Sequence, residues 1–318
     1  MSHDDSTSFP IDHKDYESFL VHKVPIVPSS GFDVADSDIH QSLFPFQRDL
    51  VRWSLRKGRS AIFATTGMGK TRMQIEWARL TGQRVLFLAP LAVAQQTIRE
   101  ASELGVTITY ARSQTDATDM TITNYEMVDR FDQDQFGAVV LDESSILKSQ
   151  DGKTRTKLIE MFARTPYRLC CTATPAPNDT AELDNYAEFL GIMSRVEMLA
   201  MFFVHDDEGW RLKGHAREPF YRWLASWGMS LMRPSDLGYD DGDYKLPPLN
   251  ITPVILPSDY VPAGQLFATS LKGITDRAAV RKSTVVVRTK AAAELINASQ
   301  DEPWIAWCGL NDEAKELA

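Results

Sequence analysis

An α/β fold built on a parallel sheet is the architecture that this sequence of 318 residues predicts. Between about residues 41 and 190, short apolar runs rich in β-branched residues alternate with longer amphipathic stretches. Short strands separated by helices are typical of βαβ units, whose strands lie parallel in one sheet. One apolar run leads into a glycine-rich loop and another ends in two carboxylates, and both features favour a domain that binds a nucleotide.

The predicted strands and helices alternate along this part of the chain. Six apolar runs predict strands, at Ala61–Thr65, Val85–Ala89, Val106–Tyr110, Met120–Thr123, Ala138–Leu141 and Arg168–Thr172. Amphipathic patterns predict helices between them, most clearly at Thr71–Leu80 and Ala92–Leu104. Asp179 with Glu182 three residues later is typical of a capping box, and predicts a helix that runs toward Leu190.

Three further segments differ from this alternating region. Residues 1–40 hold eight acidic residues against two lysines, with three prolines, and predict an irregular acidic arm. Residues 191–250 are rich in aromatic side chains and predict a helical insert followed by a linker. From residue 251 a new unit is expected, with helices at Ala278–Ala298 and Asp312–Ala318 and a buried strand at Trp304–Cys308.

Composition excludes several classes of protein. Hydrophobic residues make up 43% and charged residues 24%, as in a soluble globular protein. No apolar run approaches the roughly 18 residues of a membrane span, and the acidic start lacks the apolar region of a secretory signal. Three cysteines exclude a disulfide scaffold and favour the cytoplasm. The net charge of −9 lies mostly in the first forty residues, so it does not exclude a nucleic-acid partner.

The glycine-rich segment Ala64–Thr71 carries the strongest functional signal. It follows an apolar run and opens a helix, which is the setting of a P-loop, although a P-loop has glycine where this chain has Ala64. The main-chain N–H groups would hold a polyphosphate, Lys70 would contact its β- and γ-phosphates, and the Thr71 hydroxyl would bind Mg²⁺. The predicted nucleotide-binding residues of this loop are Thr66, Gly67, Met68, Gly69, Lys70 and Thr71.

A second set of polar residues follows other strands of the predicted sheet. Asp142 and Glu143 end an apolar strand and would share the crevice of the P-loop, because parallel strands end at one edge. Asp142 would hold Mg²⁺ with Thr71, and Glu143 would polarise the water that attacks the γ-phosphate. Thr172 and Thr174 follow the next strand, where their hydroxyls could bridge the acidic pair to a ligand.

The order of these motifs resembles the superfamily-two DEAD/DEAH-box helicases, most closely the Swi/Snf-like branch carried by phages and prophages. Phe44-Pro-Phe-Gln47 resembles the adenine-reading glutamine motif, so the resemblance assigns adenine to Gln47. Thr172 and Thr174 match the motif that couples ATP hydrolysis to strand movement in that family. Two loops resemble the family's nucleic-acid contacts, and their residues are Pro90, Leu91, Thr123, Asn124 and Tyr125.

The resemblance implies a motor of two RecA-like lobes that uses ATP and Mg²⁺, acts on double-stranded DNA, and works in the cytoplasm of a bacterial or phage-infected cell. Residues 41–190 would form the first lobe. Residues 251–318 would form the incomplete start of the second, because the sequence stops soon after Trp304–Cys308. We therefore expect slow hydrolysis by this chain alone, unless another chain supplies the missing segment with its arginine finger.

Two other functions are compatible with the same residues. A phage packaging-type ATPase also has a P-loop and an acidic box, although the upstream Gln47 and the downstream Thr-Ala-Thr-Pro175 favour the helicase reading. A remnant that binds nucleotide or DNA without turnover is the non-enzymatic alternative. The sequence leaves open whether the substrate is DNA or RNA and whether the output is unwinding or translocation.

Overall fold

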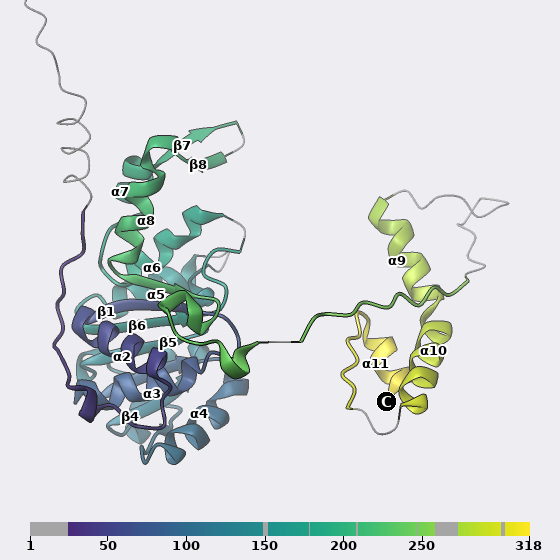
Figure 1. Cartoon of the computed structure of the whole chain (residues 1–318), viewed down its shortest axis with the longest axis horizontal. Helices are drawn as coiled ribbons and strands as arrows, with labels where there is room; N and C mark the ends of the chain where they lie inside the picture. The colour runs from purple at the N-terminus through teal and green to yellow at the C-terminus, as the bar shows by residue number, and fades with distance from the viewer. Residues whose placement is uncertain are drawn as a thin grey trace, which may run out of the picture. The chain divides into compact units, whose positions relative to one another are not determined.

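The computed structural model describes residues 25–148, 152–177, 179–207, 209–245, 247–257, 273–299 and 303–318. The chain divides into two compact units, Met1–Leu246 and Pro247–Ala318, which we call unit 1 and unit 2 and describe separately (Figure 1). The predicted acidic arm lies mostly outside the described residues, which begin at Pro25. No helix in the described part of the chain is long and apolar enough to cross a membrane.

Unit 1 is built on a seven-stranded sheet in which every neighbouring pair of strands is parallel. In spatial order the strands are β3 (Thr109–Tyr110), β4 (Met120–Asn124), β2 (Val85–Ala89), β5 (Ala138–Asp142), β6 (Tyr167–Thr172), β1 (Arg59–Ala64) and β9 (Gly228–Leu231). The predicted α/β class with a parallel sheet is confirmed, and each of the six predicted strands overlaps an observed one.

The sheet is covered on both faces, and successive residues of a strand point to opposite layers. Ala61 and Phe63 of β1 belong to one buried cluster, whereas Ile62 and Ala64 belong to the other. The first cluster includes residues of α5 (Lys153–Met161), α6 (Asp184–Phe189) and α8 (Arg217–Ala225). The second includes residues of α2 (Pro45–Lys57), α3 (Lys70–Thr81) and α4 (Leu91–Glu103).

Glycines fix the ends of the helices that position the site. Gly58 ends α2 with φ 73°, and Gly69 precedes α3 with φ 75°, a left-handed conformation that side chains disfavour. Pro45 occupies the first turn of α2, where its missing N–H costs no hydrogen bond. The predicted helices Thr71–Leu80 and Ala92–Leu104 are confirmed as α3 and α4. The helix predicted after Asp179 begins as a turn of 3-10 helix, and Asp179 Oδ1 accepts from the Ala181 N–H.

The segment after α6 contains more than the predicted helical insert. Helix α7 (Arg195–Phe202) leads into an antiparallel hairpin of β7 (Phe203–Asp206) and β8 (Gly209–Leu212), and α8 follows. Strand β9 then joins the main sheet beside β1, with Ala64 level with Leu231. The sequence did not indicate β9 because it is four residues long and its burial does not alternate regularly.

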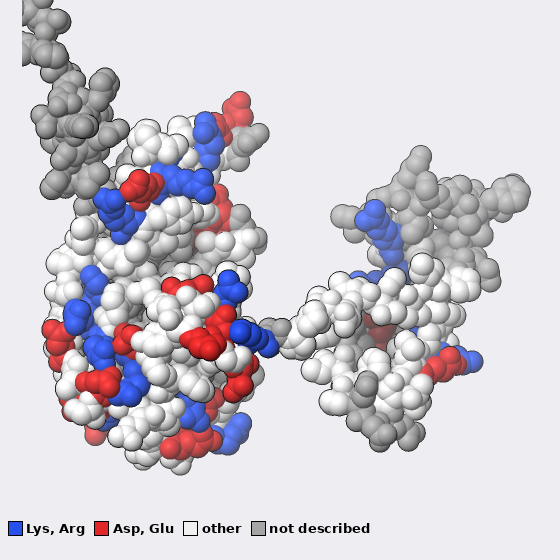
Figure 2. Space-filling model, in the orientation of Figure 1, with Lys and Arg blue, Asp and Glu red and all other residues white. Residues whose placement is uncertain are grey.

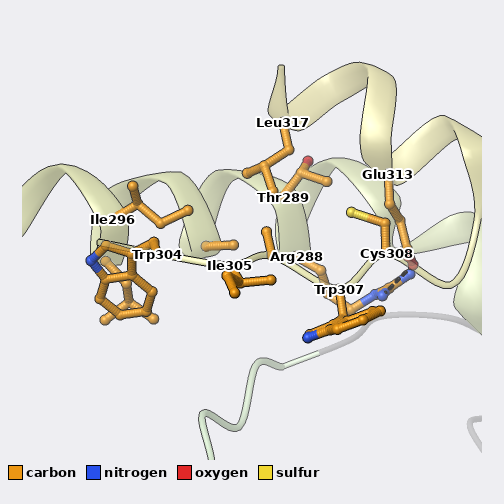
Figure 3. Close-up of a pocket in the computed structure, with 12 residues that line it drawn as sticks. Arg288, Thr289, Ile296, Trp304, Ile305, Trp307, Cys308, Glu313 and Leu317 are labelled. Carbon is orange, nitrogen blue, oxygen red and sulfur yellow. Dashed lines mark ion pairs between the residues drawn. The ribbon is translucent and has the colours of Figure 1, made fainter. Parts of the chain in front are cut away.

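Unit 2 contains the helices α9 (Gly273–Ser283), α10 (Val285–Ala298) and α11 (Asn311–Leu317). The predicted buried strand at Trp304–Cys308 is wrong: the segment has no regular secondary structure, and Trp307 is 94% exposed. No strand occurs among the described residues of unit 2, so the segment has no sheet there to join. The segment instead lies along α10 and α11 beside a hollow of about 250 Å³, where Arg288 pairs with Glu313 (Figure 3). A second RecA-like lobe stays a prediction.

Candidate nucleotide site

The predicted motifs of unit 1 lie at one edge of the sheet, because all its strands run in the same direction. The neighbouring strands β5, β6, β1 and β9 end at Asp142, Thr172, Ala64 and Leu231. The acidic pair, the Thr172–Thr174 segment and the glycine-rich loop therefore follow adjacent strand ends. This edge is where open α/β sheets bind their ligands.

The glycine-rich loop between β1 and α3 has the backbone of a phosphate cradle. Gly67 and Gly69 both have positive φ, at 87° and 75°, so the loop can curl before α3 begins. Thr66 and Gly67 are exposed, whereas Met68 is only 2% exposed. Lys70 Nζ donates to the carbonyls of Ala64 at 2.8 Å and Thr65 at 3.1 Å, which uses two of its three N–H groups.

Gln47 supports this loop from α2. Its Nε2 donates to the Met68 carbonyl at 3.0 Å, and its Oε1 accepts from the Phe44 N–H at 3.0 Å. The side chain is buried, and a Cβ on Gly69 would lie 2.3 Å from its Nε2. Gln47 therefore has a structural role that the sequence did not indicate, whereas contact with adenine stays a prediction.

Asp142 is held at the end of β5 by a residue that the sequence reading missed. Gln74 Nε2 donates to Asp142 Oδ1 at 2.7 Å, and the Tyr125 hydroxyl donates to the Asp142 carbonyl at 2.7 Å. Burial raises the pKa of the Asp142 carboxyl, and the bond from Gln74 and the charge of Lys70 oppose that rise. Gln74 stands four residues after Lys70, so helical spacing could have placed both on one face of α3.

Glu143 is the one non-glycine residue among those described that has a positive φ, at 50°. Such a conformation is strained and is often found at functional sites. Its Oε1 accepts from the Thr172 hydroxyl at 2.7 Å and from the Ser145 hydroxyl at 2.7 Å. Two hydroxyl donors thus fix this carboxylate at the strand edge.

The contacts of Thr172 continue into the loop that follows β6. The Thr174 N–H donates to Thr172 Oγ1 at 3.1 Å, and Lys148 Nζ donates to the Thr174 carbonyl at 2.5 Å. Lys148 also lies 4.0 Å from Glu182. Burial lowers the pKa of Lys148, and the two nearby carboxylates oppose that change. The structure therefore joins the predicted coupling residues to Glu143 through hydrogen bonds.

The predicted nucleic-acid residues lie at the same edge but differ in exposure. Leu91 is 62% exposed, whereas Thr123, Asn124 and Tyr125 are buried. Asn124 Nδ2 donates to Glu126 at 2.5 Å, so its amide is already engaged. Basic and acidic side chains are interspersed on the face of unit 1 that Figure 2 shows. Nucleic-acid contact at these five positions stays a prediction.

A cavity of about 770 Å³ opens beside the glycine-rich loop. The residues that line it come from the loop and its neighbours, and they are Phe44, Thr65, Thr66, Gly67, Met68, Ala173, Thr174, Met232, Asp243 and Tyr244. Thr65 ties the loop to the end of β9, because its hydroxyl donates to the Met232 carbonyl at 2.8 Å. This volume lies within the roughly 300–1,000 Å³ typical of small-molecule sites.

The residues at this edge fit a magnesium ion that is shared with a phosphate. No cluster of three or more His, Cys, Asp or Glu side chains suited to a metal occurs among the described residues. Magnesium bound with nucleotide phosphates needs only one or two protein oxygens. The hydroxyl of Thr71, in the first turn of α3, and the carboxylate of Asp142 are groups of that kind.

Comparisons with known proteins identify a similar family model and similar folds. The family model described as SNF2-related domain matches residues 46–199. The Sulfolobus solfataricus SWI2/SNF2 ATPase core in complex with dsDNA has a TM-score of 0.53 at 18% identity, covering 63% of this chain and 46% of that one. The UvsW helicase from bacteriophage T4 has a TM-score of 0.39 at 15% identity, covering 58% and 67%. No curated protein sequence matches the chain.

Two conclusions follow from these comparisons. The fold of unit 1 matches a RecA-like helicase core, as predicted. The match over residues 46–199 supports the predicted resemblance to Swi/Snf-like proteins across that segment. The chain spans less than half the length of the Sulfolobus solfataricus ATPase core.

Proposed function

We propose that unit 1 binds ATP with Mg²⁺ and hydrolyses it, as the ATP-binding lobe of a DNA helicase or translocase. The observation that carries the proposal is the Glu143 carboxylate, held by Thr172 and Ser145 at the strand end next to the glycine-rich loop. The match of residues 46–199 to the SNF2-related domain supports ATP as the nucleotide.

Binding of the polyphosphate rests on the loop and the start of α3. The main-chain N–H groups of Thr66–Thr71 and the positive end of the α3 dipole attract negative oxygens. The Lys70 ammonium, held on the Ala64 and Thr65 carbonyls, can turn its remaining N–H toward a β- or γ-phosphate. A magnesium ion held by Thr71 and Asp142 would supply positive charge to the phosphates.

Hydrolysis requires a group that orients a water molecule for attack on the γ-phosphorus. Glu143 has the suitable chemistry, because a carboxylate accepts a hydrogen bond from water and then its proton. The new bond joins the water oxygen to phosphorus, the bond to the bridging oxygen breaks, and ADP and phosphate are released. Thr172 and Ser145 would keep Glu143 aimed while this happens.

We propose double-stranded DNA as the partner that stimulates turnover. The support is the likeness of residues 46–199 to the SNF2-related domain and the solved Sulfolobus solfataricus relative in complex with dsDNA. Pro90 and Leu91 stand directly after β2, at the same edge as the nucleotide residues. Thr172 and Thr174 would couple a change at Glu143 to the loops that contact DNA. Both threonines belong to the hydrogen-bond network of Glu143.

The test is ATP binding and phosphate release with and without duplex DNA. We expect Lys70→Ala to abolish nucleotide binding and DNA to raise the wild-type rate. Lys153→Ala is a matched control, because Gly152-Lys-Thr154 repeats the Gly-Lys-Thr sequence at the start of α5 but does not line the cavity beside the glycine-rich loop. Unchanged ATP binding in Lys70→Ala would refute the nucleotide site. Binding without hydrolysis, with or without DNA, would favour the non-catalytic alternative.

A further inference from the structure

The segment Tyr239–Lys245, which follows the last strand of the sheet, folds back onto α2. The Tyr239 hydroxyl donates to the carboxylate of Asp49. Asp241 braces the segment twice, because its Oδ1 accepts from the Ser235 N–H at 2.9 Å and its carbonyl from the Tyr244 N–H at 2.7 Å. The segment is therefore held in place by contacts with α2 and by its own main chain.

These contacts place Tyr244 against two aromatic residues at the start of α2. Its ring meets Phe44 edge to face with centroids 5.8 Å apart, and meets Phe46 in the same way at 5.4 Å. Phe46 is 2% exposed and belongs to the core, whereas Phe44 is 53% exposed and Tyr244 is half-buried. Phe44 and Tyr244 thus offer aromatic surface to a ligand, on a base fixed by Phe46.

The cavity of about 770 Å³ beside the glycine-rich loop is lined both by that loop and by this aromatic surface. Thr65–Met68 line it from the loop, and Phe44 and Tyr244 line it from α2 and the returning segment. A nucleotide has a charged end and a flat aromatic end, and this cavity has a wall suited to each. Gln47 cannot supply that flat surface, because it is buried and its amide is bonded to the chain at both ends.

We propose that Tyr244, with Phe44, receives the nucleobase of the nucleotide whose phosphates lie on the glycine-rich loop. This inference rests on the proposed function of that loop and adds a binding residue that lies about 170 residues beyond it in the chain. Stacking on an aromatic ring is tolerant of base identity, because every base has a π-face. Tyr244 therefore sets affinity for nucleotides in general rather than selecting adenine.

The experiment compares ATP, GTP and inorganic triphosphate, which has no base, by calorimetry on the full chain. Tyr244→Ala should weaken the binding of ATP and GTP by roughly 5- to 100-fold and leave the binding of triphosphate unchanged. Tyr244→Phe should restore binding, because it keeps the ring. Tyr221→Ala, at a tyrosine that is 47% exposed on α8 and does not line the cavity, is the matched control and should bind as wild type.

Each other outcome has a definite meaning. If Tyr244→Ala weakened the binding of ATP and of triphosphate equally, the inference would be overturned, because Tyr244 would then act on the shape of the glycine-rich loop. Unchanged ATP binding in Tyr244→Ala would also overturn it, provided that Lys70→Ala abolishes binding. If Lys70→Ala bound ATP as tightly as the wild type, the proposed nucleotide site itself would be rejected. A thermal melt of Tyr244→Ala shows whether the variant is folded, and Tyr244→Leu, which keeps apolar bulk without the π-face, should repeat the loss.

Discussion

Thr172 Oγ1 donates a 2.7 Å hydrogen bond to Glu143 Oε1, which links the ends of the neighbouring strands β6 and β5. The Thr172 hydroxyl also accepts from the Thr174 N–H, so it is both donor and acceptor at this point. A movement of the loop after β6 would therefore change the direction of the Glu143 carboxylate. The relationship predicts a division of roles between two threonines that the sequence alone treats as equivalent.

Thr172→Val should lower the ATP hydrolysis rate by roughly 10- to 100-fold with nucleotide affinity unchanged, because it removes one hydrogen bond to Glu143, the proposed catalytic carboxylate. Thr174→Ala is the matched comparison. Thr174 enters the network through its main-chain N–H and carbonyl, which alanine retains, so its rate should fall by less than about threefold. Steady-state kinetics and nucleotide titration measure both, and an equal loss in the two variants would contradict the assigned roles.

The contact between Gln47 and Gly69 predicts that both residues control the shape of the loop. Gly69→Ala adds a Cβ 2.3 Å from Gln47 Nε2 at a positive φ, so it combines a clash with backbone strain. Gly67→Ala meets no atom within 4 Å at φ 87° and suffers only the strain, of about 1–2 kcal/mol. Thermal melts and ATP titration should therefore rank Gly69→Ala as the more damaging change.

Gln47→Ala in the Gly69→Ala background provides the control, because it removes the side chain with which the new Cβ clashes. The double variant should bind ATP more tightly than Gly69→Ala alone. If Gln47 did nothing except read adenine, the second change would only weaken binding further. That result would remove the structural role assigned to Gln47.

The sequence predicted the parts of unit 1 whose signals are local. The glycines before Lys70 and the apolar run before Asp142 each mark a strand end, and parallel pairing brings such ends together. Gln74 escaped notice because a single amide has no distinctive local pattern. Its role arises only when α3 and β5 pack together, which is a tertiary event.

The errors have the same physical origin. Strand β9 is short, and it is a strand because β1 offers a free edge at Ala61–Ala64. Trp304–Cys308 has the apolar composition of a buried strand, but the described part of unit 2 provides no neighbouring strand to pair with it. Strand formation depends on a partner that composition cannot reveal.

The buried Arg168 lies outside the candidate nucleotide site, and we expect its replacement to lower the stability of the protein strongly. Its guanidinium is buried and donates to the carbonyls of Ala163 at 2.5 Å, Thr165 at 2.9 Å and Phe189 at 2.5 Å. Arg168→Met would leave these three acceptors unpaired and should lower the free energy of unfolding by about 3 kcal/mol. Urea denaturation measures the loss.

Arg59→Ala is the comparison for that experiment. Burial, followed by the nearby charge of Arg59, lowers the pKa of Arg168 to about 10. Removing Arg59 relieves that repulsion and loses one hydrogen bond of 3.3 Å to the Pro166 carbonyl. The free energy of unfolding of Arg59→Ala should therefore differ from that of the wild type by less than about 1 kcal/mol. A greater loss in Arg59→Ala than in Arg168→Met would show that the buried guanidinium is not what joins these segments.

The three cysteines predict selective chemical modification of the native protein. Burial raises the pKa of Cys170 and of Cys171 far above the ordinary value, so at pH 8 almost no thiolate is present at either position. Cys308 is exposed. Brief treatment with iodoacetamide should therefore alkylate Cys308 alone, and Cys308→Ser should abolish the reaction, as intact-mass spectrometry would show. Denaturant should release all three thiols. Alkylation of Cys170 in the native state would mean that β6 opens readily, because both burial and its raised pKa must be overcome before that thiol can react.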